Sequence, residues 1–219
     1  MRLYFKLSES TDPIPFNYQH LLTSSINKWL GKDNEEHGKT SPYSFSWIQN
    51  TTSSKSGIYL NKDSYFFISS FDEPLLKRIL ISVLESPTLF YGISIIDIQI
   101  IETPQFNSLE RFLLSSPILL RKKENNSSKH VTYKDDDFED LLTENIRKKL
   151  KKANISIEGI KVSLDKNYRF PKTKLVTYKG IENKTTLAPI IIEGSPEQIT
   201  FAWLVGIGES TGIGFGALK

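Results

Sequence analysis

The sequence predicts an α+β fold in which one order of elements, β-α-β-β-α-β, occurs twice along 219 residues. Short segments that alternate apolar and polar residues are typical of strands, and longer segments with apolar residues at helical spacing are typical of helices. A second series of such segments follows the first after residues 104–108, which have a linker composition. This order is that of the ferredoxin-like split βαβ motif. We therefore expect two ferredoxin-like domains in tandem, residues 1–105 and 106–219.

The first domain opens on a strand at residues 2–7, where Leu3, Phe5 and Leu7 alternate with polar or amphipathic side chains. A helix is predicted over residues 17–30, with Asn17 as its N-cap and Gly31 as its stop. The remaining elements are expected as strands 43–48, 56–61 and 64–70, a hairpin loop at 61–63, a helix 75–84 beginning near Asp72 or Glu73, and a β-branched strand 93–101.

The second domain repeats the order of elements without a close sequence repeat. The expected elements are strand 118–122, a loop over 122–137, helix 137–153, strand 155–164, a hairpin of 174–178 with 187–193 around Gly180 and Asn183, helix 196–205 and strand 214–219. Ser195 is the predicted N-cap of the last helix, and Pro196 stands at its first position, where proline is favoured.

Composition excludes several classes of function. The chain has no cysteine, so disulfides, thiol catalysis and thiolate metal sites are ruled out. No histidine pattern typical of a metal site is present, and the acidic run at 135–137 is explained by a helix start. We therefore expect neither metal nor cofactor. No segment has the length of a membrane span and no signal peptide is visible, so a cytoplasmic location is expected.

The end of the chain is unusually rich in glycine. Five of the twelve glycines fall within eleven residues, at positions 206, 208, 212, 214 and 216. Glycine at this density weakens a regular element, so the backbone must need positive φ, close approach of a ligand, or both. Exposed backbone N–H groups bind anions such as phosphate. The segment lacks the lysine of a P-loop and cannot open a dinucleotide-binding βαβ unit.

Basic residues cluster twice in the second domain, although the net charge of the chain is only +3. The first cluster lies in a loop and hairpin that also carry aromatic residues able to stack on bases; its members are Lys166, Arg169, Lys172, Lys174, Lys179 and Lys184, interleaved with Tyr168, Phe170 and Tyr178. The second cluster, residues 147–152, is interpreted mainly as a solvated helix face.

Three histidines are the candidates for a general base near neutral pH. His37 lies in a polar stretch after the first predicted helix, where loops commonly carry function. His20 lies on that helix, and His130 lies in a loop-like stretch. On residue type alone, each is as well explained as an ordinary surface histidine.

The glycine pattern Gly206-x-Gly208, five residues, then Gly214-Phe215-Gly216 resembles the C-terminal glycine-rich loop of the RAMP superfamily of CRISPR systems. With a helix before it, at the end of the chain, it is similar to the repeat-processing endoribonuclease of that group. Members of that family often carry a histidine soon after the first helix and then an aromatic-Ser/Thr-Phe-Ser strand. Here these are His37 and the stretch Tyr43-Ser44-Phe45-Ser46.

The resemblance implies a metal-independent endoribonuclease that cleaves CRISPR precursor RNA within its repeats. His37 is then the catalytic acid or base, Lys39 or Lys32 neutralises the phosphate, and His20 faces the same cleft. The 2′-OH attacks, leaving a 2′,3′-cyclic phosphate and a 5′-OH. Some members use a helical tyrosine, where this chain has Asn27. RNA is expected on Gly206, Gly208, Gly212, Gly214 and Gly216 and on Arg169, Lys172 and Lys174.

Two other functions stay open at this point. The first is a non-catalytic RNA-binding RAMP subunit of a CRISPR effector complex, because RAMP folds also serve as backbone proteins. The second is a nucleotide-binding or phosphotransfer protein, which the missing Walker lysine disfavours. The sequence is equally compatible with a monomer and with a homodimer.

Overall fold

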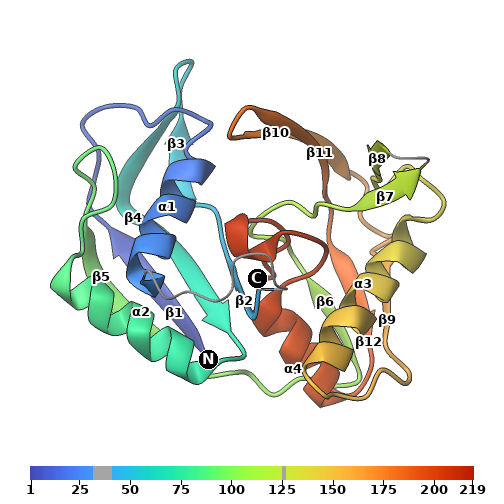
Figure 1. Cartoon of the computed structure of the whole chain (residues 1–219). Helices are drawn as coiled ribbons and strands as arrows, with labels where there is room; N and C mark the ends of the chain where they lie inside the picture. Colours follow the sequence, from blue (N-terminus) through green and yellow to red (C-terminus); the bar gives the residue numbers. More distant parts are fainter. Residues whose placement is uncertain (32–40, 125–126) are drawn as a thin grey trace.

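The computed structural model describes residues 1–31, 41–124 and 127–219, and it has two α+β halves side by side (Figure 1). Each half has its own hydrophobic core. One core is built from residues between Leu3 and Ile95, and the other from residues between Phe112 and Leu218. The α+β fold class is therefore confirmed, whereas the domain boundary at residue 105 stays a prediction.

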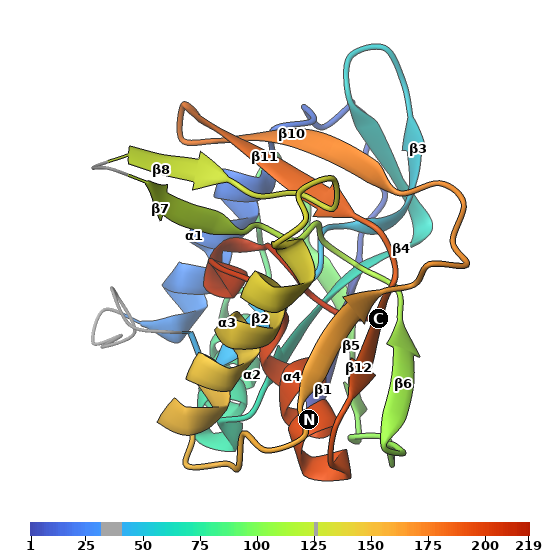
Figure 2. The same cartoon turned by 90° about the vertical axis from the view of Figure 1, so that its right-hand side faces the viewer.

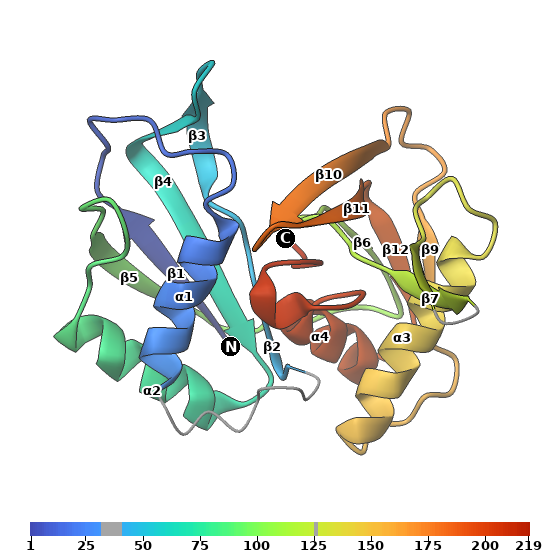
Figure 3. The ribbon, with the colours of Figure 1, turned by 45° about the horizontal axis from the view of Figure 1, so that its top comes forward.

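The N-terminal half is one antiparallel sheet with two helices on one face (Figure 3). Its strands run in the order β2-β4-β1-β5, with β3 paired to β4, which is the ferredoxin-like order. Leu3, Phe5 and Leu7 are buried in the core shared with the helices because alternate residues of a strand point to the same face. The elements are β1 (Arg2–Leu7), α1 (Gln19–Leu30), β2 (Tyr43–Phe45), β3 (Gln49–Ser53), β4 (Ile58–Ser70), α2 (Glu73–Glu85) and β5 (Ile95–Ile101).

The C-terminal half repeats the plan with a smaller sheet and two added hairpins (Figure 2). The sheet order is β6-β12-β9, and the position of a fourth strand is held by a single bridge between Leu114 and Leu218. The elements are β6 (Leu109–Phe112), the hairpin of β7 (Arg121–Glu124) and β8 (Ser127–His130), α3 (Phe138–Lys152), β9 (Lys161–Leu164), the hairpin of β10 (Lys172–Tyr178) and β11 (Ile181–Leu187), β12 (Ile190–Glu193), α4 (Pro196–Val205) and the 3₁₀ turn η1 (Thr211–Ile213).

Side-chain caps set the helix starts where the sequence predicts them. The Ser195 hydroxyl accepts from the Gln198 backbone N–H, and the Gln198 side-chain oxygen accepts from the Ser195 backbone N–H. These two bonds form a complete capping box for α4. Asp72 accepts from the Leu75 N–H at 3.2 Å and starts α2. The prediction of Asn17 as the cap of α1 is wrong, because the N-cap is Tyr18 and it makes no side-chain cap bond.

Several strand predictions are also wrong. Residues 61–63 form no hairpin, because β4 runs unbroken through them and the chain reverses earlier, where Ser54 N–H bonds to Gly57 O at 2.8 Å. The partner of β10 is β11, so of the predicted strand 187–193 only Leu187 pairs with β10, whereas residues 190–193 form β12 in another sheet. Residues 214–219 are not a strand. Of the predicted strand 118–122 only residues 121 and 122 belong to one, β7, and most of the β7–β8 hairpin falls where the sequence predicts a loop over 122–137.

Arg2 fixes the two halves to each other. Its Nη2 donates to Leu218 O at 2.7 Å and to Trp203 O at 3.3 Å, which joins the first strand to the last residues of the chain. Its guanidinium lies between the Phe67 and Trp203 rings, at 3.8 and 3.6 Å from their centroids. Burial lowers the pKa of Arg2 to about 10, so it remains charged at neutral pH. Cation–π contacts of this desolvated kind hold surfaces together.

Candidate nucleic-acid interface

The glycine-rich segment, residues 206–216, lies between the two halves and is held by donors from the first. Trp47 Nε1 donates to Gly214 O at 2.7 Å, Gln19 Nε2 donates to Ile213 O at 2.6 Å, and the Tyr43 hydroxyl donates to Gly212 O at 3.1 Å. These three bonds link residues more than 160 positions apart. The segment is therefore a part of the junction between the halves.

Four of the five glycines have the expected positive φ, with 74° at Gly206, 80° at Gly208, 88° at Gly214 and 63° at Gly216. All five are buried, and their close approach is to the chain itself. A Cβ at Gly216 would overlap Ile207 O, and one at Gly214 would lie 2.7 Å from the Phe45 ring.

Several N–H groups of the glycine-rich segment face inward, which differs from the outward orientation expected. The N–H groups of Gly206, Gly214 and Gly216 bond to carbonyls of Ala202, Thr211 and Pro117. The predicted role of the five glycines in binding RNA stays a prediction.

A basic pocket, here called the lysine pocket, lies where α3 meets the glycine-rich segment. It encloses about 680 Å³ and is lined by Lys148, Lys149, Lys151 and Lys152 of α3, by Gly208, Glu209, Ser210 and Thr211, and by Ser41 and Asn145. Within the described residues, the N–H groups of Gly208, Ser210 and Thr211 make no hydrogen bond. Unpaired amides beside several ammonium groups suit a phosphate oxygen.

Lys149 is the buried member of this pocket, with 6% of its surface exposed. Its Nζ donates to Gly206 O at 3.0 Å, at the C-terminal end of α4. Burial lowers the pKa of Lys149 to about 7, and the negative charge of Glu209 offsets only part of this effect. An ammonium with this pKa changes its charge near neutral pH and is sensitive to any anion placed beside it.

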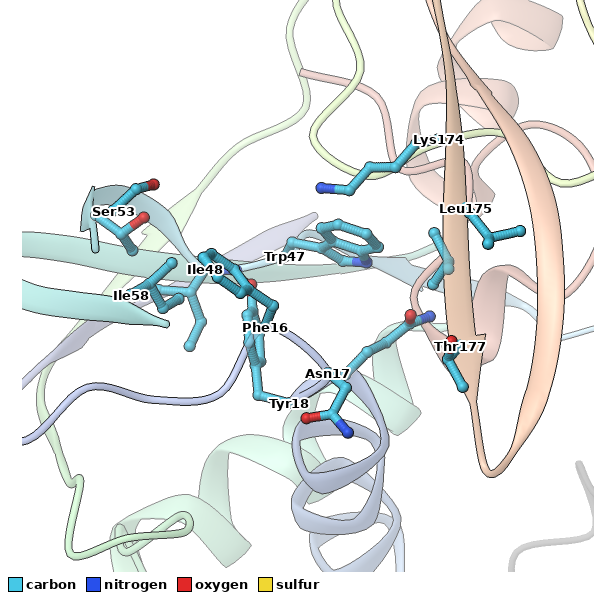
Figure 4. A pocket seen from close by; sticks show the side chains of 13 residues that line it. Phe16, Asn17, Tyr18, Trp47, Ile48, Ser53, Ile58, Lys174, Leu175 and Thr177 are labelled. Atoms are coloured by element: carbon cyan, nitrogen blue, oxygen red, sulfur yellow. The ribbon is translucent and has the colours of Figure 1, made fainter. Parts of the chain in front are cut away.

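A second pocket, here called the cleft pocket, opens between the halves (Figure 4). It is lined by residues at the start of α1, between β2 and β3, and in β3, β4 and β10. Its volume is about 420 Å³. Lys174 extends from β10 over the Trp47 ring, with Nζ 4.4 Å from the ring centroid (Figure 4). Phe16 lines the same pocket and is 58% exposed. An exposed aromatic face beside a cation can stack a base and contact its phosphate.

Of the predicted catalytic residues, the structure describes only His20. His37 and Lys39, with the alternative Lys32, lie outside the described residues, whose next member, Ser41, lines the lysine pocket. His20 lies in the first turn of α1, and its Nδ1 is 2.7 Å from Asn17 O. Residue 30, where the chain leaves α1 toward His37, is ten residues further and thus about 15 Å along the helix.

Only one of the three predicted RNA-binding basic side chains lines a pocket. Lys174 lines the cleft pocket, whereas Arg169 and Lys172 are exposed and line neither pocket. His130 ends β8 and lines neither pocket.

Sequence reasoning missed the lysines of α3 by assigning them to a solvated face. A signal for Lys149 was available, because it follows Ile146 by three residues and Leu142 by seven, so it falls on the apolar stripe of the helix. A charged residue in an apolar stripe is rarely buried without a role. Trp47 carried no comparable signal, since an aromatic residue in a predicted strand, here 43–48, most often belongs to a core.

The described residues hold neither a metal-binding cluster nor a membrane-spanning helix. Residues 1–31, 41–124 and 127–219 contain no cluster of three or more His, Cys, Asp or Glu side chains suited to a metal ion. Within the same ranges, every helix is too short or too polar to cross a lipid bilayer.

Comparisons with known proteins place the chain in a family. One relative is a Pyrococcus furiosus protein with the name "putative CRISPR-associated endoribonuclease-like protein Cas6". It is 27% identical to this chain, over all of this chain and 98% of its own length. The solved structure of a Cas6-related gene product from Pyrococcus furiosus has a TM-score of 0.85 at 27% identity, covering all of this chain and 97% of that one.

Another solved structure, titled as a RAMP protein binding different RNA substrates, also has a TM-score of 0.85, at 26% identity, covering all of this chain and 98% of that one. The family model described as CRISPR associated protein Cas6, C-terminal, matches residues 101–219, which is more than half of the chain. The chain therefore belongs to the Cas6 family of CRISPR-associated proteins.

Proposed function

We propose that this protein is a metal-independent endoribonuclease that cleaves CRISPR precursor RNA within its repeats. The observation that carries the proposal is the lysine pocket, where four lysines of α3 and unpaired amides of the glycine-rich segment meet beside Ser41. Ser41, which lines this pocket, follows His37 by four residues in the sequence. Membership of the Cas6 family agrees with an RNA substrate of this kind.

The proposed chemistry uses the RNA's own 2′-OH as the nucleophile. His37 acts as general base or acid, and Lys39 neutralises charge that develops on the phosphate, with His20 as a candidate assistant. The 2′-OH gives its proton to the general base as its oxygen forms a bond to phosphorus. The bond from phosphorus to the 5′-oxygen breaks, and that oxygen takes up a proton from the general acid or from water. The products are a 2′,3′-cyclic phosphate and a 5′-OH, and no metal takes part.

The RNA chain on either side of the reacting phosphate has two surfaces to bind. Lys149 and its neighbours hold phosphates in the lysine pocket, while Trp47, Phe16 and Lys174 take an unpaired base with its phosphate in the cleft pocket. Arg169 and Lys172 extend the basic surface along the start of β10. The partner is thus repeat RNA, and binding within a larger CRISPR effector complex is the second candidate role.

The test is incubation with a candidate repeat RNA in excess EDTA, followed by mapping of the product ends. We expect a single cut per repeat with cyclic phosphate and 5′-OH ends at an unchanged rate. Cleavage abolished by EDTA contradicts the mechanism. Tight binding with no cleavage contradicts the enzyme and favours the non-catalytic subunit.

The buried Lys149 predicts a pH dependence of RNA binding. A phosphate beside Lys149 favours its charged form, so the pKa of Lys149, about 7 in the free protein, rises in the complex. Binding above pH 7 then takes up a proton, and affinity falls as pH rises, by at most about tenfold per pH unit. Titration of RNA binding between about pH 6 and 9 measures this slope. We expect Lys149→Met to flatten it.

The matched control is Lys151→Met, which removes an exposed lysine of the same pocket. It should weaken binding at every pH by a similar factor and leave the slope in place. An unchanged slope in Lys149→Met would show that Lys149 contacts no phosphate.

A further inference from the structure

From Ile96 onward, strand β5 forms an unusually apolar free edge of the N-terminal sheet; its first residue is covered, because the Ile95 N–H donates to Pro87 O at 3.0 Å. It is the last strand in the order β2-β4-β1-β5, and in the part of the chain that the structure describes its one strand neighbour is β1. Its seven residues, IIDIQII, include five isoleucines, one charge, and neither proline nor lysine. Soluble proteins normally protect such an edge with charges, proline or a covering segment, because it invites pairing with another chain.

The apolar surface continues from the strand onto α2. Leu84 of α2 is 69% exposed, and Ile96 and Ile100 of β5 are 58% and 55% exposed. Together with Leu80 and Ile98 they line a groove of about 510 Å³ between the helix and the strand. This groove lies on the side of the sheet that the helices cover, since Ile98 and Ile100 are opposite Phe5 and Leu3 in the ladder.

The sequence of β5 is complementary to itself in the antiparallel direction. Counted outward from Ile98 along the free part of the strand, Asp97 corresponds to Gln99, and Ile96 corresponds to Ile100. If two copies pair antiparallel with Ile98 opposite Ile98, then Ile96 lies opposite Ile100, and each Asp97 carboxylate lies opposite a Gln99 amide. Within one chain these two side chains already approach, with Gln99 Nε2 3.4 Å from Asp97 Oδ2.

Other registers lose this match. Centring the pair on Asp97 places two carboxylates opposite each other, and centring it on Gln99 places Ile96 opposite Glu102; like charges or an unmatched charge on an apolar partner disfavour pairing. The Ile98-centred register also puts both α2 helices on the same face, because paired residues of an antiparallel ladder point to the same side. Leu84 of each copy can then cover isoleucines near the two-fold axis.

We propose that this chain forms a two-fold homodimer in which β5 of one copy pairs antiparallel with β5 of a second copy, centred on Ile98. The occupant of the apolar groove is thus a second copy of the same face, as a two-fold interface requires. The register shift between Lys6 and Leu7 limits the regular β1 ladder to residues 97–101, so Asp97–Gln99 forms the centre of the contact.

The dimer leaves both RNA pockets open. β5 lies at the margin of the N-terminal half that faces away from the C-terminal half (Figures 1 and 3). The cleft pocket and the lysine pocket are instead lined by residues at the junction of the halves. The assembly therefore presents two outward-facing RNA sites, and its existence does not depend on whether the RNA is cleaved.

Cysteine cross-linking tests the register directly, because the natural chain has no cysteine to give a background. In I98C the two thiols meet at the two-fold axis, where paired Cβ atoms lie about 4.5–5.5 Å apart, close enough for a disulfide after a small adjustment. We expect mild oxidation of I98C to give a covalent dimer. I96C and I100C should cross-link efficiently only when the two variants are mixed.

Charge changes at Gln99 give a second, independent readout of dimer affinity by sedimentation. Gln99→Asp places carboxylates opposite each other twice and should raise the dimer Kd by roughly 2–30-fold, whereas Gln99→Lys should preserve or tighten the dimer. The matched control Ile181→Lys, at the exposed tip of another hairpin, should change nothing. A wild-type chain that stays monomeric at all concentrations overturns the proposal, as does efficient cross-linking of I100C alone.

Discussion

His37→Ala is expected to lower the rate of repeat-RNA cleavage by about 10²–10⁴-fold, the usual contribution of one general acid or base. RNA affinity should be nearly unchanged, because the proposed binding surfaces are the lysines of α3 and the aromatic residues of the cleft pocket. Single-turnover cleavage and equilibrium binding, measured on the same RNA, separate the two effects. Cleavage at the normal rate would remove His37 from the mechanism.

The two other histidines provide matched controls for this experiment. The His20 ring is already engaged with Asn17 O through Nδ1 at the start of α1, and His130 lies at the end of β8. His130→Ala should cleave normally. If His20 only assists, His20→Ala should cleave RNA at a rate within about tenfold of normal, because the larger loss of rate is expected only for the group that transfers the proton. A loss in His20→Ala as large as that in His37→Ala would assign the proton transfer to His20.

Helices were the part of this fold most open to prediction from sequence. Their ends depend on local chemistry, such as the Ser195 capping box and the Asp72 cap, and their buried faces follow from a 3.6-residue period. Strands were harder. Asn61, Lys62 and Asp63 have the composition of a turn, yet β4 continues through them because Ser64 Oγ and the Asn61 side chain both bond to Asn50 O on the neighbouring strand.

The candidate site was predictable only in outline. The glycine pattern singles out residues 206–216, part of which lines the lysine pocket. The residues that hold this segment, Trp47, Gln19 and Tyr43, lie more than 160 positions away, and a pattern of one residue type carries no information about them. The lysines of α3 look like an ordinary charged run until α4 and the glycine-rich segment are folded against them. Only the helical position of Lys149 marked that run as different.

Gly216→Ala, which adds a single methyl group, is expected to destabilise the fold strongly, because two penalties coincide. Gly216 has φ +63°, which costs a non-glycine residue about 1–2 kcal/mol, and its Cβ would overlap Ile207 O on a backbone that cannot rotate away. Overpacking of this kind adds about 1–3 kcal/mol. Together they amount to about 2–5 kcal/mol, or a fall in Tm of about 4–20 °C for a chain of this size.

Gly180→Ala is the matched control, because it carries the backbone strain without the steric overlap. Gly180 has φ +79° at the turn of the β10–β11 hairpin, and no atom lies within 4 Å of where its Cβ would be, so only the backbone strain applies. Thermal unfolding of the two variants should therefore differ, with Gly216→Ala clearly the less stable. If both unfold alike and Gly216→Ala alone loses RNA binding, then the bare backbone at Gly216 serves the RNA and not the packing of the chain. A variant that unfolds early would lose RNA affinity only in proportion to its unfolded fraction, so binding measured well below the Tm decides between the two roles.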